Sequence, residues 1–279
     1  MGQEKEPLVA GHYGVNDLGE KILDGLKRSG IDLETLTPVD LAPVDEFHMG
    51  GRAATAHIVG LMDLPGDARV LDIGSGLGGV VRFLAAEKGC QVSGIDLTPE
   101  FVSVAQMLTD RTSLSDHVDF HVGSALDLPW PDASFDAATT FHVAMNIADR
   151  PRLYEEAARV IRPRGVFAIF DVMKGPSEGM VFPVPWAETE ETSFLTTPAQ
   201  MEKLLSDAGF EIVHKEDRSE LAIEHHHARV AELSKAGGPP PLGLHLLQGE
   251  TASLKSQNTL KMLEARQILL IGMIARRRD

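Results

Sequence analysis

The stretch from residue 69 to residue 79 constrains the fold of this chain more than any other. It begins with an apolar, partly β-branched run, which is typical of a buried parallel strand. Its glycines then stand at alternate positions, Gly74, Gly76 and Gly78. Glycine has no Cβ, so it permits a tight turn and lets a ligand lie directly against the backbone. Apolar residues at helical spacing follow, so the pattern predicts a strand, a glycine turn and a helix.

Two acidic residues narrow the class of ligand. Gly74, Gly76 and Gly79 satisfy the G-x-G-x-x-G pattern of dinucleotide-binding proteins, which is weak evidence by itself. Asp72, however, stands two residues before the first glycine, where a carboxylate suits a cation better than a pyrophosphate. Asp96 ends the next apolar run, where an acid can accept hydrogen bonds from both hydroxyls of a ribose. S-adenosylmethionine (SAM) fits both acids, because it has a ribose, an ammonium group and no phosphate.

The turn from Asp72 to Gly78 resembles the Asp/Glu-x-Gly-x-Gly-x-Gly motif of the class I SAM-dependent methyltransferases. This resemblance implies SAM as the cofactor and S-adenosylhomocysteine (SAH) as its product. The implied cofactor contacts are Tyr13, Asp72, Gly74, Gly76, Gly78, Asp96, Leu97, Ser124, Ala125 and Phe141. Among them, the glycines line the methionine part, Asp96 takes the ribose, and Ser124 and Ala125 lie near the adenine. Tyr13 would close over the cofactor from the N-terminal region.

Strand and helix patterns alternate through the middle of the chain. Predicted strands cover residues 70–73, 92–96, 118–122, 135–140 and 166–171, and helical patterns separate most of them. Such alternation favours a parallel sheet with helices on both faces. We predict an α/β fold with a Rossmann-like, seven-stranded, mostly parallel sheet. Its last two strands are placed at residues 210–216 and 267–275, and the resemblance implies that the last one is antiparallel.

The remaining segments are expected to cover this core. Residues 1–65 are predicted to form an N-terminal helical cap, with helices at 17–29 and 53–61 and a proline-bearing connection at 36–45. Residues 66–175 form the SAM-binding core. Residues 176–279 hold a substrate loop, the last two strands and a helical lid inserted between them, with helices at 220–236 and 251–265.

Candidate substrate residues lie after the fourth strand, in the cap and in the loop after the fifth strand. His142 is the candidate base, because histidine titrates near neutral pH. Asn146 lies just beyond it, and His48 flanks a pair of glycines with Arg52, which could clamp a carboxylate. Trp186 could wall the acceptor pocket. Methyl transfer from a sulfonium mainly requires alignment and a dry site, so a base helps only an acceptor that must lose a proton.

Composition excludes several classes of partner. The formal charge is −15 with no long basic cluster, which argues against a nucleic acid substrate. The single cysteine and the lack of a leader or a long apolar span favour a cytoplasmic protein with no membrane partner. Three consecutive histidines, His225 to His227, point in different directions on a helix, so no metal site is predicted. The predicted cap and lid could also bury the surface of a homodimer.

Beyond the core motifs, the chain is similar to the sarcosine and dimethylglycine N-methyltransferase-like group. The similarity covers residues 48–50, 159–165, 169–174 and 226–227. It implies a small-molecule amine as the methyl acceptor. Three alternatives remain at this point: an O-methyltransferase with His142 as base, an NAD-type oxidoreductase, and a non-catalytic module that keeps the fold.

Overall fold

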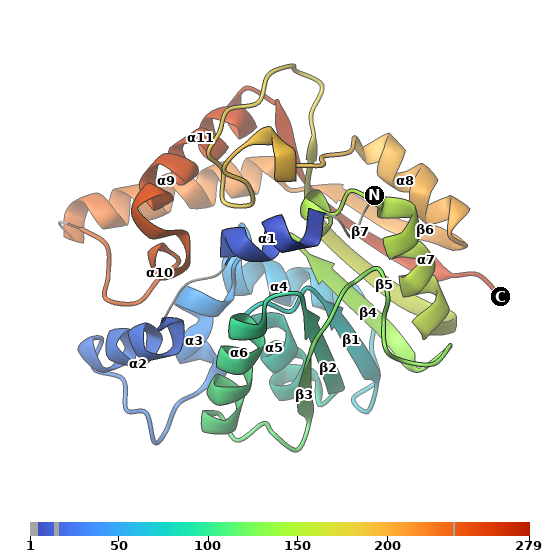
Figure 1. Cartoon of the computed structure of the whole chain (residues 1–279), viewed down its shortest axis with the longest axis horizontal. Coiled ribbons are helices and arrows are strands. Elements are labelled where there is room, and N and C mark those ends of the chain that lie inside the picture. The colour runs from blue at the N-terminus through green and yellow to red at the C-terminus, as the bar shows by residue number, and fades with distance from the viewer. Residues whose placement is uncertain (1–4, 14–16, 237) are drawn as a thin grey trace.

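The computed structural model describes residues 5–13, 17–236 and 238–279. Its centre is one seven-stranded sheet in the order β3-β2-β1-β4-β5-β7-β6 (Figure 1). All neighbours from β3 to β5 are parallel, and β7 is antiparallel to both β5 and β6. The strands are β1 (Arg69–Ile73), β2 (Gln91–Asp96), β3 (Val118–Val122), β4 (Phe135–Phe141), β5 (Ile161–Lys174), β6 (Phe210–Asp217) and β7 (Ile268–Arg277). The predicted mostly parallel sheet is confirmed.

Helices cover both faces of the sheet, as predicted. On one face, α4 (Gly51–Gly60), α5 (Gly79–Lys88), α9 (Ser219–Ala236) and α11 (Ala252–Glu264) contribute to one apolar cluster with the strands. On the other face, α7 (Arg150–Val160) and α8 (Pro198–Asp207) pack against the alternate strand residues. Successive residues of a strand point to opposite faces, so Val70 and Leu71 belong to different clusters. Because α4 and α9 share the core cluster, the cap and the lid are packed onto the sheet.

The N-terminal region contains more helix than the sequence predicted. Residues 36–45 were expected to be a connection, but α3 (Pro38–Asp45) lies there. Thr37 caps it, and its backbone N–H donates to Asp40 Oδ2 at 2.9 Å. Proline is well tolerated in the first turn of a helix, so Pro38 is compatible with this start, and the second proline, Pro43, obscured the signal. The helix predicted at 17–29 is present as α2 (Leu18–Arg28), and α1 (Glu6–Tyr13), which was not predicted, precedes it.

The N-terminal cap and the inserted lid contact each other directly. α9, α11 and the short α10 (His245–Gln248) all lie between β6 and β7, as predicted for an inserted lid. Leu242 and Leu247 pack in one apolar cluster with α2, α3 and α6 (Pro99–Arg111). A Cβ on Gly25 of α2 would lie 2.6 Å from the carbonyl oxygen of Pro241, so the lid loop rests directly on the cap. Figure 1 shows α10 beside α2, with α1 crossing in front of the sheet edge.

A buried ion pair joins the cap to the core. Arg82 of α5 is fully buried, and its Nη2 donates to Asp45 Oδ2 at 2.7 Å and to the carbonyl oxygen of Leu77 in the glycine turn. Its Nη1 donates to Thr109 Oγ1 at 2.9 Å and to the Ala105 carbonyl at 3.2 Å, both on α6. A single guanidinium therefore connects α3, the glycine turn, α5 and α6.

We expect Arg82→Met to lower the free energy of unfolding by about 3–5 kcal/mol, because the buried carboxylate of Asp45 would lose its counter-ion. Chemical denaturation measures this loss. Arg52→Met is the control, since the Arg52–Glu87 pair is partly exposed and should change stability by about 1 kcal/mol or less. Equal effects of the two substitutions would contradict the assigned role of Arg82.

Candidate active site

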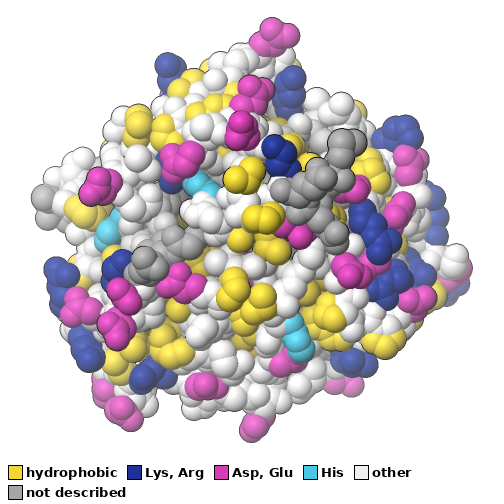
Figure 2. All heavy atoms as spheres, viewed as in Figure 1, with side chains coloured by type: hydrophobic (Ala, Val, Ile, Leu, Met, Phe, Trp, Pro, Cys, Tyr) yellow, Lys and Arg dark blue, Asp and Glu magenta, His cyan; other side chains and the backbone are white. Residues whose placement is uncertain are grey.

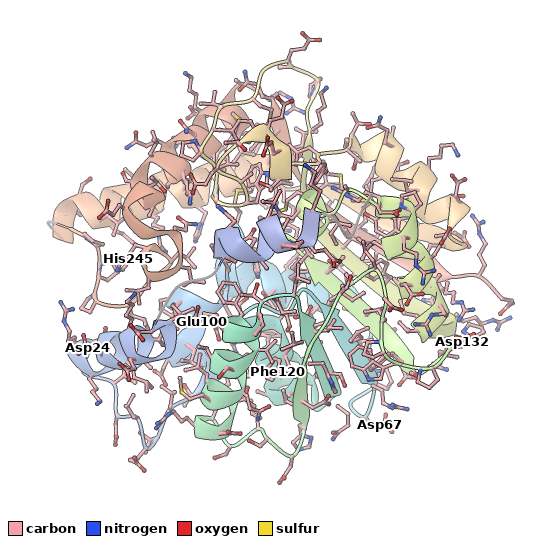
Figure 3. The ribbon with its side chains drawn as sticks, in the orientation of Figure 1. Asp24, Asp67, Glu100, Phe120, Asp132 and His245 are labelled. Atoms are coloured by element: carbon pink, nitrogen blue, oxygen red, sulfur yellow. The ribbon has the colours of Figure 1, made fainter. Side chains whose placement is uncertain are left out.

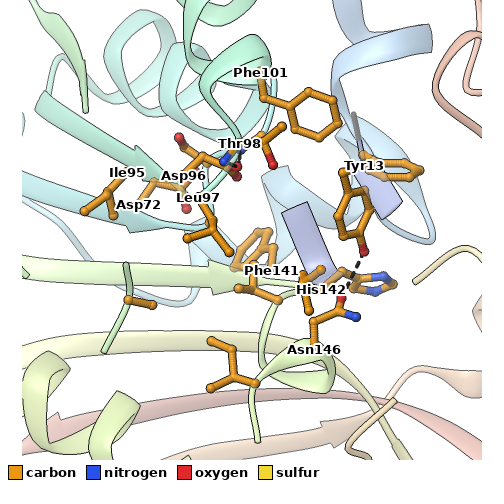
Figure 4. Close-up of a pocket in the computed structure, with 18 of the residues that line it drawn as sticks. Tyr13, Asp72, Ile95, Asp96, Leu97, Thr98, Phe101, Phe141, His142 and Asn146 are labelled. Carbon is orange, nitrogen blue, oxygen red and sulfur yellow. Dashed lines mark hydrogen bonds between the residues drawn. The ribbon is translucent and has the colours of Figure 1, made fainter. Parts of the chain in front are cut away.

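The first cavity lies at the carboxyl ends of β1, β2 and β4, where ligands bind in open α/β sheets. It has a volume of about 140 Å³. Figure 4 shows Asp72, Ile95, Asp96, Leu97 and Thr98 on one side and Phe141, His142, Asn146 and Tyr13 on the other. Phe101 and Leu126 also line it, together with Gly74, Ser75, Gly76, Gly123 and Ala125. We call this the inner cavity.

The glycine turn follows β1 directly and keeps its backbone open toward the inner cavity. The N–H groups of Gly74 and Ser75 donate to the carbonyl of Ile95 at 2.8 and 3.0 Å, so the turn is tied to β2. Gly74 has φ +78°, and a Cβ there would lie 2.3 Å from a methyl group of Val143. At Gly76, with φ +51°, nothing lies within 4 Å of a Cβ position. The first glycine is therefore required by packing, and the second leaves room for a ligand.

Two carboxyl groups face this turn, as the sequence predicted. Asp72 is 2% exposed, and its Oδ1 accepts from Thr139 Oγ1 at 2.6 Å. Burial raises the pKa of Asp72 to about 7, against the smaller opposite effect of the Thr139 hydrogen bond. Asp96 accepts from the backbone N–H of Gly76 at 2.9 Å and of Thr98 at 2.8 Å. Burial raises the pKa of Asp96, and hydrogen bonds from the backbone of Thr98, Gly76 and Leu97 and from the Thr98 side chain oppose this effect.

Tyr13 closes the inner cavity from the cap. Its hydroxyl donates to Asn146 Oδ1 at 2.9 Å, which Figure 4 marks with a dashed line. The ring lies 6.0 Å from the rings of Phe47 and Phe101, measured between centroids. Asn146 in turn donates from Nδ2 to the carbonyls of Trp186 at 2.7 Å and Thr192 at 3.0 Å. The amide of Asn146 thus holds the cap and the loop after β5 together, rather than facing a ligand unpaired.

His142 stands where the inner cavity meets a second one. It has φ +57°, and its backbone N–H donates to the carbonyl of Phe170 at 2.7 Å. Its Nε2 is buried, and within the described part of the chain it has no hydrogen-bond partner. Burial holds the pKa of His142 well below its usual value, and the nearby His48 lowers it further. The ring is therefore neutral at physiological pH, and its Nε2 atom can still form a hydrogen bond.

His48 is held firmly beside His142, with 5.8 Å between the ring centroids. Its Nε2 lies 2.9 Å from both Glu46 Oε2 and Thr55 Oγ1, and the Thr55 hydroxyl donates to the same carboxylate oxygen at 2.6 Å. These three polar side chains are buried. The hydrogen bond to His48 lowers the pKa of Glu46 against the effect of burial, so Glu46 remains ionised.

The second cavity, which we call the outer cavity, lies between cap and lid and has a volume of about 1320 Å³. It shares Tyr13, Phe47, His48 and His142 with the inner cavity. Trp186 lines it, with its indole N–H donating to Ser193 Oγ at 3.0 Å. Arg52 also lines it, but its guanidinium pairs with Glu87 at 2.7 Å and lies over the Phe83 ring. Arg52 is therefore not held as a free carboxylate clamp.

Two other predicted residues lie differently from the expectation. Gly78 opens α5 with φ +84°, and a Cβ there would lie 2.7 Å from Phe120, so it serves packing instead of lining the inner cavity. The hydroxyl of Ser124 donates to Glu6 of α1 instead of facing the cavity. The sequence did not indicate that Glu46, Thr55 and Phe101 belong to the site, because their roles depend on contacts between cap and core. For Phe101 alone a signal was available, namely its place among apolar residues at the start of a helix.

Two further kinds of site, a metal centre and a membrane-spanning helix, are absent from the described residues. Within residues 5–13, 17–236 and 238–279, no group of three or more His, Cys, Asp or Glu side chains is placed to hold a metal ion. In the same part of the chain, no helix is both long and apolar enough to cross a bilayer. Figure 2 shows hydrophobic side chains near the centre of the face where α1 crosses, with acidic side chains spread around them.

Comparisons with known proteins find similarity to methyltransferases. Residues 71–169 match the family model described as a methyltransferase domain. The chain is 28% identical over 191 residues to the glycine/sarcosine/dimethylglycine N-methyltransferase of Actinopolyspora halophila, a match covering 68% of this chain and 34% of that protein. It is 32% identical to the sarcosine/dimethylglycine N-methyltransferase of Halorhodospira halochloris, covering 62% of each. The first match therefore spans about a third of the length of that relative, and the second spans less than two thirds.

Solved structures show the same fold at low sequence identity. A sarcosine dimethylglycine methyltransferase from Galdieria sulphuraria, described as putative, superposes with a TM-score of 0.66 at 22% identity over 81% of this chain and 85% of that one. The cyclase SpnF superposes with a TM-score of 0.69 at 23% identity over 99% and 95% of the two chains. The fold therefore occurs in proteins with different activities, and the site has to decide the function.

We expect Gly74→Ala to lower the free energy of unfolding by about 2–5 kcal/mol, because a Cβ meets Val143 and the backbone has positive φ. Gly76→Ala is the matched control: it has positive φ but open space, and should cost about 1–2 kcal/mol. Thermal or chemical denaturation without ligand compares them. A smaller loss for Gly74→Ala than for Gly76→Ala would contradict the packing role.

Proposed function

We propose that this chain is a SAM-dependent methyltransferase that acts on a small-molecule acceptor, and that an amine is the acceptor class. The observation that supports it best is the junction at His142. There a cavity with the methyltransferase glycine turn and both acids opens into a second, larger cavity. A methyl group held in the first cavity could reach an acceptor held in the second through this junction.

The residues present fit SAM. Gly76 leaves open space above the turn, and the buried Ser75 Oγ in the inner cavity has no partner among the described residues. Asp72 could pair with an ammonium group and Asp96 could accept from ribose hydroxyls, since both carboxyl groups line the inner cavity. Leu97, Ala125, Leu126 and Phe101 offer apolar walls for a base. When bound, SAM supplies an activated methyl group.

The protein's own contribution is then alignment and exclusion of water. Tyr13, fixed by Asn146, covers the inner cavity from the cap, and Phe141 walls it from β4. An amine acceptor needs only to arrive neutral and aligned. The buried, neutral His142 could also accept a proton through Nε2, which favours a hydroxyl acceptor as the second candidate.

Calorimetric titration of the protein with SAM, SAH and NAD tests the cofactor. We expect both sulfur nucleosides to bind and NAD not to bind. The raised pKa of Asp72, about 7, means that the group is mostly protonated near pH 6. A bound ammonium group favours the carboxylate, so binding should release up to one proton near pH 6 and less near pH 8, and affinity should rise with pH between them.

Buffers of different ionisation enthalpy reveal that proton release as a change in the observed heat. Asp72→Asn is the matched variant, because it keeps the shape of the side chain and removes the titration. Release that persists in Asp72→Asn would assign it to another acid, such as Asp45, whose pKa burial raises to about 6. NAD binding without SAM or SAH binding would overturn the proposed function.

His142→Asn separates the two acceptor classes. Asparagine tolerates positive φ, so the backbone should be maintained. With an amine such as sarcosine or dimethylglycine, we expect kcat to fall by less than about tenfold, since no base is required. With a hydroxyl acceptor, loss of a base should lower kcat by about 100-fold or more. Radiolabelled methyl transfer measures both, and SAH affinity within about twofold of the parent protein confirms that the inner cavity is intact.

A further inference from the structure

The outer cavity is far larger than a small amino acid requires. Its volume of about 1320 Å³ exceeds the usual range of about 300–1,000 Å³ for pockets that hold drug-sized ligands. Many lining side chains are apolar and come from cap, core and lid: Met49, Met145, Pro185, Trp186, Leu244 and Leu246. An apolar wall of this extent favours a ligand with an apolar body.

One end of this cavity carries an unpaired positive charge. Arg229 of α9 is half-buried and lines the outer cavity. Among the described residues, neither a hydrogen bond nor an ion pair engages its guanidinium. Its Nη2 lies 3.6 Å from the position of a Cβ on Gly243, so it is packed against the loop before α10. Arginine stays charged, and a half-buried guanidinium without a counter-ion is suited to a carboxylate or phosphate.

Histidines surround Arg229 at this end. His225, His226 and His245 line the same cavity. Burial lowers the pKa of His226 and of His245, and the charge of Arg229 lowers both further, so these two rings are neutral hydrogen-bonding groups near pH 7. His226 Nε2 lies 3.2 Å from Ser256 Oγ. Together these groups surround Arg229 with polar side chains that could bind further oxygens of an anion.

The other charged residues of the lining are mostly engaged elsewhere. The guanidinium of Arg52 is neutralised by Glu87, and the carboxylate of Glu46 is bound by His48 and Thr55. Glu250 is exposed at the surface of the lid. In a chain with a formal charge of −15, a cationic end in a partly closed cavity is a specific feature instead of a consequence of composition.

The cationic end is separated from the methyl-transfer junction. His142 lines both cavities, whereas Arg229 and His245 line only the outer one. Figure 3 shows His245 on the side of α10, away from α1 and the strand ends that hold the inner cavity. A molecule that reaches both places therefore needs a body between its anionic group and its methyl-accepting atom.

We propose that the acceptor is an amphipathic anion, whose carboxylate or phosphate binds Arg229 and whose apolar body lies along the outer cavity toward His142. This inference rests on the proposed methyl transfer for the identity of the reacting end. The anion site itself does not depend on it. Sarcosine has its carboxylate next to its amine, so it would leave most of this cavity unfilled.

Three matched probes test the anion site: phenylbutyrate, phenylbutyl phosphate and phenylbutanol, titrated calorimetrically into the protein with and without saturating SAH. We expect at least one anion to bind about tenfold or more tightly than the alcohol, because a charge-assisted hydrogen bond is lost in the alcohol. The tighter of the two anions identifies the headgroup. Equal affinities for all three probes, or no measurable binding of any, would overturn the proposal.

Arg229→Gln should weaken the preferred anion by about tenfold or more and leave the alcohol within about twofold. Lys235→Gln is the control, because it removes the same charge from the same helix at an exposed position outside the cavity lining. An unchanged anion affinity in Arg229→Gln contradicts the assignment. Failure of SAH to bind while the anion preference persists would refute the proposed methyl transfer and leave the anion site standing.

Discussion

The buried guanidinium of Arg82 fixes the parts of this protein that make its inner cavity. One charged group, fully removed from water, must find its partners within the protein, because a buried unpaired charge is strongly unfavourable. It finds them on α3, on the glycine turn and on α6. The carbonyl of Leu77 and the carboxylate of Asp45 are therefore held at fixed positions around the start of α5. The turn and the cap above it cannot shift independently.

This arrangement explains which parts of the site could be read from the sequence. The strand, the turn and the two acids are local features, since each depends on residues a few positions apart. Burial on both faces of β1 and the tight turn after it leave few other conformations for Val70 to Gly76. Asp96 follows its own strand in the same way, so both acids were predicted and both face the inner cavity.

The closure of the site could not be read from the sequence, because it depends on pairs far apart in the chain. Tyr13 and Asn146 are separated by 133 positions, and Arg82 and Asp45 by 37. Nothing in either neighbourhood specifies its partner. The pairing of Arg52 could not be read from the sequence for the same reason, since Glu87 becomes its neighbour only when α4 packs beside α5. An arginine inside the apolar pattern of α5 was the one available signal for a buried charge.

Most polar groups around the two cavities are occupied by partners within the protein. The amide of Asn146, the indole of Trp186, the guanidinium of Arg52 and the imidazole of His48 all have such partners. Groups used in this way set the shape of the cavities and do not need a ligand. The exceptions therefore carry more information than the lining as a whole.

Three of these exceptions follow one path. Ser75 Oγ lies in the inner cavity, His142 Nε2 lies at the junction, and Arg229 lines the outer cavity alone. Asp45 and Glu46 also have one unpaired oxygen each, but each is already bound through its other oxygen. A transfer reaction requires a donor site, a point of contact and an acceptor site in that order. This chain has one unpaired group in the inner cavity, one at the junction and one in the outer cavity, which supports the proposal that the two cavities form one active site.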